Sequence, residues 1–302
     1  MRRKRILFYN YFEDWINIYK VGAVSERTID KYWLAHRHLK KLAPDLELGQ
    51  ITRIEYQKII NEFAETHEKA TTMDFHHQLK SSILDAFDDG LIDRDPTRKT
   101  VVKGKKPGKK KQKYLSEFEL KMLLRHLHLG TEPNLDWLIL LVAKTGLRFG
   151  EALGLTKEDF DFENQIINIS KTWDYKAARG GFKSTKNKSS IRKVQLDWKL
   201  CMQFNTLLRD FPDGTPIFVK KRVFNSTVNN RLKQYCEELA ILIISIHGLR
   251  HTHASMLLFA GVSIASVAKR LGHADMTTTQ QTYLHIIQEL ENKDNTKIMR
   301  SE

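Results

Sequence analysis

The sequence predicts a mainly α-helical protein with a small antiparallel β-sheet, organised as two domains joined by a basic linker. Apolar and aromatic residues recur every three or four positions through residues 8–92, which is the period of amphipathic helices. Apolar and polar residues instead alternate near residues 165–172 and 190–196, which is typical of strands. Between these regions lies a lysine-rich segment. We therefore expect a helical bundle over residues 1–95, a linker over 96–113 and an α+β domain over 114–302.

The composition favours a polyanionic partner. The 302 residues include 50 Lys and Arg against 36 Asp and Glu, a formal net charge of +14. A hydrophobic content of 41% is enough for a buried core. No apolar run reaches the ~18 residues of a membrane helix, and two cysteines, Cys201 and Cys236, cannot build a disulfide framework. We expect a cytoplasmic protein with reduced thiols and no membrane partner.

Four or five short helices are expected in the first domain. The aromatic stripe of Tyr11, Phe12 and Trp15 marks the first helix and is typical of a helix face that packs into a core. Pro44 stops the second helix, and Gly90 ends the fourth. The expected helices cover residues 8–19, 25–42, 52–63 and 71–90.

The linker carries charge of a single sign. No acidic residue lies between Asp95 and Glu117, whereas Lys and Arg contribute nine positive charges there. So strong a charge, with Pro and Gly interspersed, predicts an extended segment that buries no apolar surface. It is either a solvated tether or a strand laid along a phosphate backbone, where each neutralised phosphate releases counterions. The expected DNA contacts are Lys105, Lys106, Lys109, Lys110 and Lys111.

The second domain begins with a capping box, Ser116-Glu-Phe-Glu119, that predicts a helix to about residue 128. The apolar run from Leu135 to Lys144 predicts a buried helix closed by Gly146. Gly180-Gly181 marks a turn between the two expected strands. Further helices are expected over residues 226–240, 248–260, 263–271 and 277–288.

Four short blocks in this domain carry residues that could act together. They are Thr145-Gly-Leu-Arg148-Phe-Gly-Glu151, His247-Gly-Leu-Arg250, Leu271-Gly-His273 and Tyr283. Each block alone has a structural explanation, such as a salt bridge between Arg148 and Glu151. Together, in this order and spacing, the blocks resemble the tyrosine recombinase (phage integrase) family. The resemblance covers the chain from about residue 8 and is strongest over 114–285, and the linker looks most like those of integrases from phages and conjugative elements of Gram-positive bacteria.

This resemblance implies a SAM-like core-binding bundle followed by a tyrosine-recombinase catalytic domain. It implies a site-specific recombinase that cleaves and rejoins double-stranded DNA at core sites through a 3′-phosphotyrosine, integrating or excising a prophage or mobile element. The reaction would need neither metal nor ATP, and no cofactor is expected. The resemblance further implies a tetramer on DNA, architectural or excision factors from the host or the element, and a nucleoid-associated protein in the bacterial cytoplasm.

The resemblance also assigns the catalytic residues. Tyr283 would be the nucleophile. Arg148 and Arg250 would bind the scissile phosphate, because a guanidinium donates two parallel hydrogen bonds and keeps its proton. His247 has the pKa range of a general base or proton relay on the tyrosine hydroxyl. His273 would hydrogen-bond the phosphate.

Two further assignments concern a brace and an acid. Glu151 would brace the Arg148 side chain. The family places a lysine on the β-hairpin that protonates the leaving 5′-hydroxyl. The segment Lys186-Asn-Lys-Ser-Ser-Ile-Arg192 resembles that region, so Lys186 is the expected acid and Lys183 the alternative.

Other interpretations remain open in the sequence. Histidines at 247 and 251 have a zinc-like spacing, but no glutamate lies between them as hydrolytic zinc motifs require. A catalytically silent DNA-binding accessory or regulatory protein would be expected to lack one of the catalytic residues. A type IB topoisomerase-like relaxing enzyme would share the chemistry. Integrases with two DNA specificities carry an additional arm-binding domain, so the chain is either a simple recombinase or lacks that front domain.

The tail beyond Tyr283 carries apolar residues at helical spacing: Leu284, Ile286, Ile287 and Leu290. We expect this tail to dock onto a neighbouring subunit, and the alternative is packing against its own domain.

Overall fold

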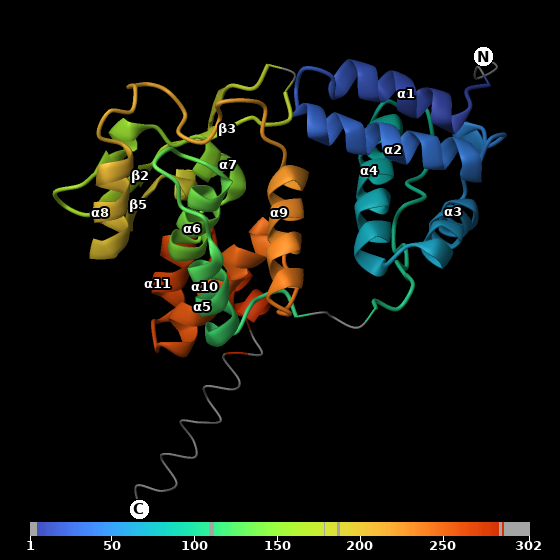
Figure 1. Ribbon diagram of the computed structural model, residues 1–302. Coiled ribbons are helices and arrows are strands. Elements are labelled where there is room, and N and C mark those ends of the chain that lie inside the picture. The colour runs from blue at the N-terminus through green and yellow to red at the C-terminus, as the bar shows by residue number, and fades with distance from the viewer. Residues whose placement is uncertain (1–4, 109–111, 178, 186–187, 284–285, 287–302) are drawn as a thin grey trace, which may run out of the picture. The chain divides into compact units, whose positions relative to one another are not determined.

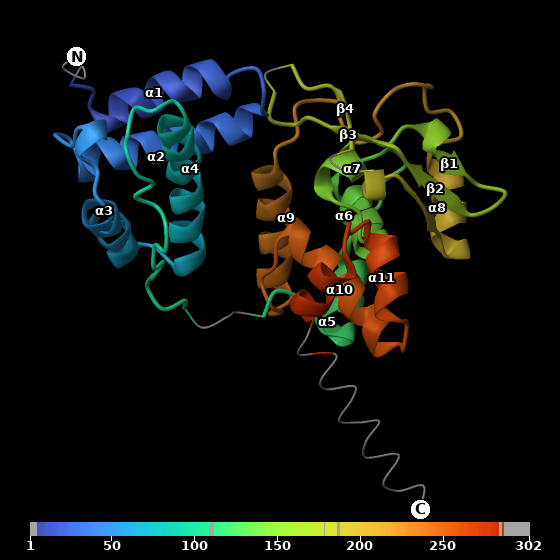
Figure 2. The same ribbon diagram turned by 180° about the vertical axis from the view of Figure 1, so that it is seen from behind.

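The structure is a computed structural model that describes residues 5–108, 112–177, 179–185, 188–283 and 286. The chain divides into two compact units, Met1–Lys111 and Gln112–Glu302, each drawn in Figures 1 and 2. The mainly helical fold with small antiparallel sheets is confirmed. Among the described helices, none combines the length and the apolar character needed to cross a membrane.

The described part of the first unit contains four α-helices. They are α1 (Phe8–Tyr19), α2 (Glu26–Leu42), α3 (Arg53–Thr66) and α4 (Lys69–Asp88), with a 3₁₀ turn, η1 (Leu48–Gln50), before α3. Ser25 caps α2, and Thr52 forms a capping box at the start of α3. The fourth helix begins at Lys69, two residues before the expected start at Thr71. The aromatic stripe of α1 lies in the core, where the Trp15 indole donates a 2.6 Å hydrogen bond to Asp85 of α4.

The start of the lysine-rich segment is not a free linker, so the expected boundary at residue 96 is wrong for this part. Thr97 is buried, and Val102 packs against the core of the first unit. The Gln57 amide on α3 binds both backbone groups of Val101, donating to its carbonyl at 2.8 Å and accepting from its N–H at 2.9 Å. The packing of Val102 and the two hydrogen bonds of Gln57 to the Val101 backbone therefore hold this part of the segment against the charge repulsion that predicted a fully solvated strand.

A glycine brings the same segment against the start of α4. At Gly104 a Cβ atom would lie 2.1 Å from the backbone nitrogen of Lys69, so no larger residue fits without displacement. The next residue, Lys105, donates its backbone N–H to the carbonyl of His67 at 2.8 Å. Residues 97–105 thus belong to the first unit, and residues 109–111 lie outside the described residues.

In the second unit, the buried helix α6 is surrounded by other helices and two small sheets (Figure 1). Its α-helices are α5 (Glu117–His126), α6 (Leu135–Thr145), α7 (Phe149–Leu153), α8 (Trp198–Leu207), α9 (Asn225–Glu238), α10 (Ile246–Phe259) and α11 (Ile264–Leu271), and residues 276–283 are also helical. The 3₁₀ turns are η2 (Lys157–Asp159) and η3 (Lys188–Ser190). The three-stranded sheet has the order β1 (Phe160–Asp161), β2 (Ile166–Ile169), β5 (Arg192–Gln195), and the two-stranded sheet pairs β3 (Lys171–Trp173) with β4 (Phe182–Ser184).

The expected strand over residues 165–172 is in fact two strands in different sheets, separated at Ser170. The second of them, β3, lies directly beside α7 in both views (Figures 1 and 2). Gly154 makes this approach possible, because a Cβ there would lie 2.8 Å from the backbone carbon of Thr172. β3 thus packs closely against α7 and pairs with β4, whereas β2 stays in the three-stranded sheet.

A second apolar cluster lies beside the main core of this unit. Tyr283 and Ile286 pack there with α10 and α11 residues such as Leu258 and Leu271. For Ile286 the alternative holds: this residue packs against its own domain, and the expected docking onto a neighbouring subunit is wrong for it. Leu284, Ile287 and Leu290 lie outside the described residues.

Candidate active site

A glycine turn at the end of α6 positions the first arginine. Gly146 closes the helix in the left-handed conformation, with φ 69°, and a Cβ there would lie 2.7 Å from the His253 ring. The chain then reverses into α7, whose N-terminal cap is Arg148. Its guanidinium donates to Glu151 at 2.7 Å and to the carbonyl of Gly272 at 2.9 Å. The side chain is 39% exposed, so part of the guanidinium remains available to a ligand.

Glu151 holds two arginines at once. Its side chain is 2% exposed and pairs with both Arg148 and Arg192, the latter with Nη2 at 2.9 Å from Oε2. Burial alone would raise the pKa of this carboxyl, but hydrogen bonding by Arg192 and the charges of both arginines outweigh burial and lower the pKa. Glu151 is therefore ionised, and the structure places it as the brace that the sequence predicted for Arg148.

Sequence reasoning did not name Arg192 as a site residue. Its side chain is 5% exposed and forms an ion pair with Glu151. Its Nε donates a hydrogen bond to the carbonyl of Arg270 at 2.7 Å. The sequence feature that could have identified Arg192 is its position at the end of the family-like segment that begins at Lys186. Two guanidiniums now share one carboxylate, which leaves an excess of positive charge.

The second predicted arginine meets the first at the turn after α11. Arg250 is 4% exposed and donates to the carbonyls of Gly146 and Leu271, each at 2.7 Å. Arg148 donates to the next residue, Gly272, so both guanidiniums lie at one turn. Burial and the charge of Arg148 lower the pKa of Arg250 to about 9, which leaves it charged at neutral pH.

His273 follows this turn directly. Its Nδ1 lies 2.7 Å from the hydroxyl oxygen of Thr279, which fixes the ring. Burial, followed by the charges of Arg250 and Arg148, lowers the pKa of His273 to about 4. The imidazole is therefore neutral, and it lies close enough to the two arginines for their charges to act on it.

Tyr283 is buried at 2% exposure, and its hydroxyl lies 2.9 Å from Nδ1 of His251. The structure therefore does not bring His247, the expected partner, to the hydroxyl. His247 instead contacts the His251 ring edge to face, with centroids 4.8 Å apart and planes at 90°. Burial raises the pKa of Tyr283 to about 12.

The lysine assignment remains a prediction. Lys186 lies outside the described residues. The alternative, Lys183, is described on β4, where its ammonium pairs with Asp174 and the side chain is largely exposed.

The histidines do not gather with acidic or cysteine side chains. Within the described parts of the chain, no group of three or more His, Cys, Asp or Glu residues could hold a metal ion. His253, which shares the histidine-rich stretch, accepts a 2.9 Å hydrogen bond from Arg270 and is buried.

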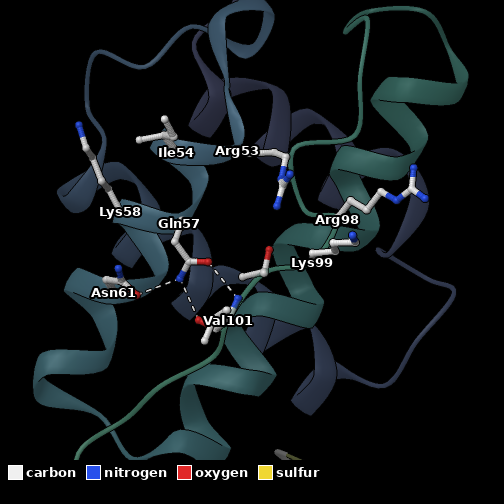
Figure 3. A pocket seen from close by; sticks show the side chains of 9 residues that line it. Arg53, Ile54, Gln57, Lys58, Asn61, Arg98, Lys99 and Val101 are labelled. Carbon is white, nitrogen blue, oxygen red and sulfur yellow. Dashed lines mark hydrogen bonds between the residues drawn. The ribbon is translucent and has the colours of Figure 1, made fainter.

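A basic groove lies in the first unit, between α3 and the segment that follows residue 97 (Figure 3). Arg53, Arg98 and Lys99 gather at one end of the groove, and Lys58 lies at the other. The Gln57 amide joins α3 to the segment on the other side of the groove by its hydrogen bonds to the Val101 backbone. The nine described residues that line the groove therefore include four cationic side chains and no acidic one. Of the five lysines expected to contact DNA, Lys105 and Lys106 are exposed nearby in the same segment, and Lys109, Lys110 and Lys111 lie outside the described residues.

Comparison with known proteins places this geometry in a family. The model of the phage integrase family matches residues 113–289. The integrase of Staphylococcus phage L54a is 29% identical over 166 residues, which cover 49% of this chain and 47% of that protein. The ICEBs1 integrase of Bacillus subtilis is 28% identical, covering 47% and 42%. A probable integrase of prophage ps2 from Lactococcus lactis is 27% identical and matches 94% of this chain and 80% of its own. The chain thus spans less than half of the first two relatives.

Solved structures share the fold. The Tn1549 transposon integrase in complex with transposon right end DNA has a TM-score of 0.75 at 17% identity, covering 92% of this chain and 95% of its own. A lambda integrase dimer bound to a core site has a TM-score of 0.64 at 15% identity, covering 92% and 77%. The resemblance noted from the four sequence blocks is confirmed.

Proposed function

The chain belongs to the phage integrase family, and on that premise we propose that it is a site-specific DNA recombinase. It would cleave and rejoin double-stranded DNA through a 3′-phosphotyrosine, and so integrate or excise a phage or mobile element. The observation that carries the proposal is that Arg148 and Arg250 both bind the turn after α11. The Tyr283 hydroxyl contacts His251, the residue that follows Arg250 in the sequence.

The site supplies positive charge where phosphoryl transfer needs it. A phosphodiester under attack develops charge on its non-bridging oxygens, and preorganised guanidiniums stabilise that charge without reorganising. Arg148 and Arg250 are held by backbone carbonyls, and Glu151 keeps Arg148 in place. We assign both arginines, with neutral His273 as a hydrogen-bonding neighbour, to the scissile phosphate.

The reaction conserves the phosphodiester energy. The Tyr283 oxygen attacks phosphorus, a phosphotyrosine bond forms, and the bond to the 5′ oxygen breaks. That oxygen leaves with a proton, which we assign to Lys186 by its place in the family motif. Rejoining is the reverse reaction with a different 5′-hydroxyl, so no cofactor or external energy source is required.

We propose that the first unit holds the DNA backbone in the basic groove and along the adjacent lysines. Each phosphate that a side chain neutralises contributes about 0.9 to the slope of log affinity against log salt. Replacing Arg53 and Arg98 by glutamine should therefore lower the magnitude of that slope by about 2. Lys31→Gln is the matched control, because Lys31 lies outside the groove and pairs with Asp74. An unchanged slope in the double variant would remove the groove from the DNA-binding surface.

We further propose that the protein assembles as a tetramer on two duplexes, with the tail beyond residue 287 docking onto a neighbouring subunit. Architectural or excision factors would act with it, and it would work at the nucleoid in the bacterial cytoplasm. Deleting residues 288–302 leaves Ile286 against Tyr283. The deletion should spare binding to one half-site and abolish the synapsis of two sites, as measured by native gel electrophoresis. Wild-type synapsis by the truncated protein would refute the docking role.

A plasmid assay separates this function from its two alternatives. The substrate is a plasmid that carries both junction sequences of the genomic element encoding the chain. A recombinase yields recombined circles that depend on both junctions. A relaxing enzyme instead unwinds a supercoiled plasmid without any junction, and a silent DNA-binding protein does neither.

A further inference from the structure

We propose that His251 accepts the proton of the Tyr283 hydroxyl as this oxygen attacks DNA, an inference that rests on the proposed recombinase function. The carrying observation is the 2.9 Å contact between the hydroxyl oxygen and Nδ1 of His251. The sequence assigned this role to His247, one helical turn earlier on α10.

The contact allows the Tyr283 hydroxyl to donate its hydrogen to His251. Among the described residues, Tyr283 makes no second hydrogen bond through its hydroxyl, so His251 is the acceptor within reach for the hydroxyl hydrogen. In the proposed arrangement the hydroxyl donates to an unprotonated Nδ1, and the ring carries its hydrogen on Nε2. This is the arrangement that a general base needs before the reaction begins.

The surroundings keep His251 neutral and the tyrosine protonated while DNA is absent. Partial burial, followed by electrostatic repulsion from His247, Arg250 and Lys113, lowers the pKa of His251 to about 4. Burial raises the pKa of Tyr283 to about 12. Without a substrate, proton transfer from the hydroxyl to the imidazole is therefore strongly unfavourable.

The scissile phosphate changes this balance. It brings negative charge to Arg148 and Arg250, and a negative charge near an imidazole favours its protonated form. The charge that suppresses protonation of His251 is thus offset only when a phosphate is bound. The same contact therefore restrains the nucleophile in the DNA-free protein and activates it in the complex.

The step balances in both directions. In cleavage, the Tyr283 O–H bond breaks and its proton moves to Nδ1 of His251. The phosphotyrosine bond forms as the bond to the 5′ oxygen breaks, and that oxygen takes the proton of the acid. In rejoining, the 5′-hydroxyl attacks phosphorus and gives its proton back to the acid, the tyrosine oxygen leaves, and His251 returns its proton to that oxygen.

His247 has a different place in this arrangement. Its ring stands at 90° to the ring of His251, with the centroids 4.8 Å apart. It therefore acts on the nucleophile through His251, as a positioning residue that limits rotation of the accepting ring.

Two substitutions at one position separate proton transfer from positioning. In His251→Asn, the amide oxygen occupies the region of Nδ1 and can still accept the hydroxyl hydrogen bond, but it cannot take a proton at neutral pH. In His251→Phe, both functions are lost. The measurement is the single-turnover rate of covalent adduct formation on a nicked core site, with folding checked by thermal unfolding. His126→Asn, at a half-buried histidine that pairs with Glu238, is the control for a His→Asn change outside the site.

General base catalysis predicts that both His251 variants lose roughly 100-fold or more in rate. Imidazole added to His251→Ala should restore part of the rate in proportion to its unprotonated form. If His251→Asn keeps a rate within about threefold of wild type while His251→Phe loses it, the residue only positions the tyrosine and the proton-acceptor role is wrong. Wild-type rates in both variants exclude either role. These results differ from failure of the proposed function, in which the wild-type protein itself forms no adduct.

Discussion

Replacing Glu151 by glutamine tests the ionic network on which the site is built. The carboxylate accepts four hydrogen bonds, two from Arg148 at 2.9 and 2.7 Å and two from Arg192 at 3.1 and 2.9 Å. A glutamine keeps one acceptor oxygen and turns an amide N–H₂ toward groups that are themselves donors. It also leaves two guanidiniums without a counter-charge, and one of them, Arg192, is almost fully buried.

Removing one partner of a buried ion pair costs about 3–5 kcal/mol. For a unit of this size, such a loss lowers the unfolding midpoint by roughly 6–20 °C. Calorimetry on the full chain measures the shift for the second unit, and the adduct assay should show a parallel loss because Arg148 is no longer held.

The matched control is Glu117→Gln, which removes a carboxylate from the exposed pair with Lys121 on α5. Exposed pairs of this kind contribute little, because water and salt screen them and two long side chains must be ordered. The control should leave the midpoint where it is. If Glu151→Gln shifts the midpoint no more than this control, Glu151 is not the structural centre of the arginine cluster.

Two further predictions concern the first unit. Gly104→Ala should push the segment off Lys69 and accelerate tryptic cleavage there, whereas Gly108→Ala, with no atom within 4 Å of the added Cβ, should leave cleavage at the wild-type rate; equal rates in the two variants would contradict the packing. His76, buried and bonded to Tyr56, has a pKa that burial lowers from 6.5 to about 4, so its contribution to stability is full above pH 6.5 and is lost as the pH falls toward 4. Urea unfolding between about pH 7.5 and pH 5 should show a loss of about 2 kcal/mol that is absent in His76→Gln.

Much of the helical framework could be predicted from the sequence because the patterns that indicate it are local. The aromatic stripe of α1 and the capping boxes at Thr52 and Ser116 each need only a few neighbouring residues, and the structure contains all three elements. Helix α7 escaped prediction because five residues are too short for a period to show. The division of the long strand depends on Gly154 meeting Thr172, a tertiary contact that no local pattern contains.

The docking of residues 97–105 was hidden for a similar reason. The lysines dominate the composition of the segment, whereas its attachment depends on a distant glutamine, Gln57, and on the absence of a Cβ at Gly104. Composition predicts how a segment behaves on average. It does not register two specific contacts that hold the segment in place.

The site was readable in part. Arg148, Arg250 and His273 meet as their order in the family motif implies. Helical spacing puts His247 and His251 one turn apart on α10, so either could reach a tyrosine on the neighbouring segment. Which ring meets Tyr283 depends on where residues 276–283 cross α10, and the sequence carries no signal for that crossing.

The central claim is that Tyr283 becomes covalently attached to DNA. A core-site duplex with a nick close to the cleavage position traps the adduct, because the short 3′ product diffuses away and rejoining fails. Without divalent metal or ATP, the wild-type protein should give a denaturant-resistant adduct carrying a 3′-phosphotyrosine and a free 5′-hydroxyl. Tyr283→Phe removes one oxygen from a buried ring, so it should bind the same DNA with unchanged affinity and form no adduct. An adduct formed by Tyr283→Phe, or a wild-type protein that binds the trapped site and never becomes attached, would contradict the account.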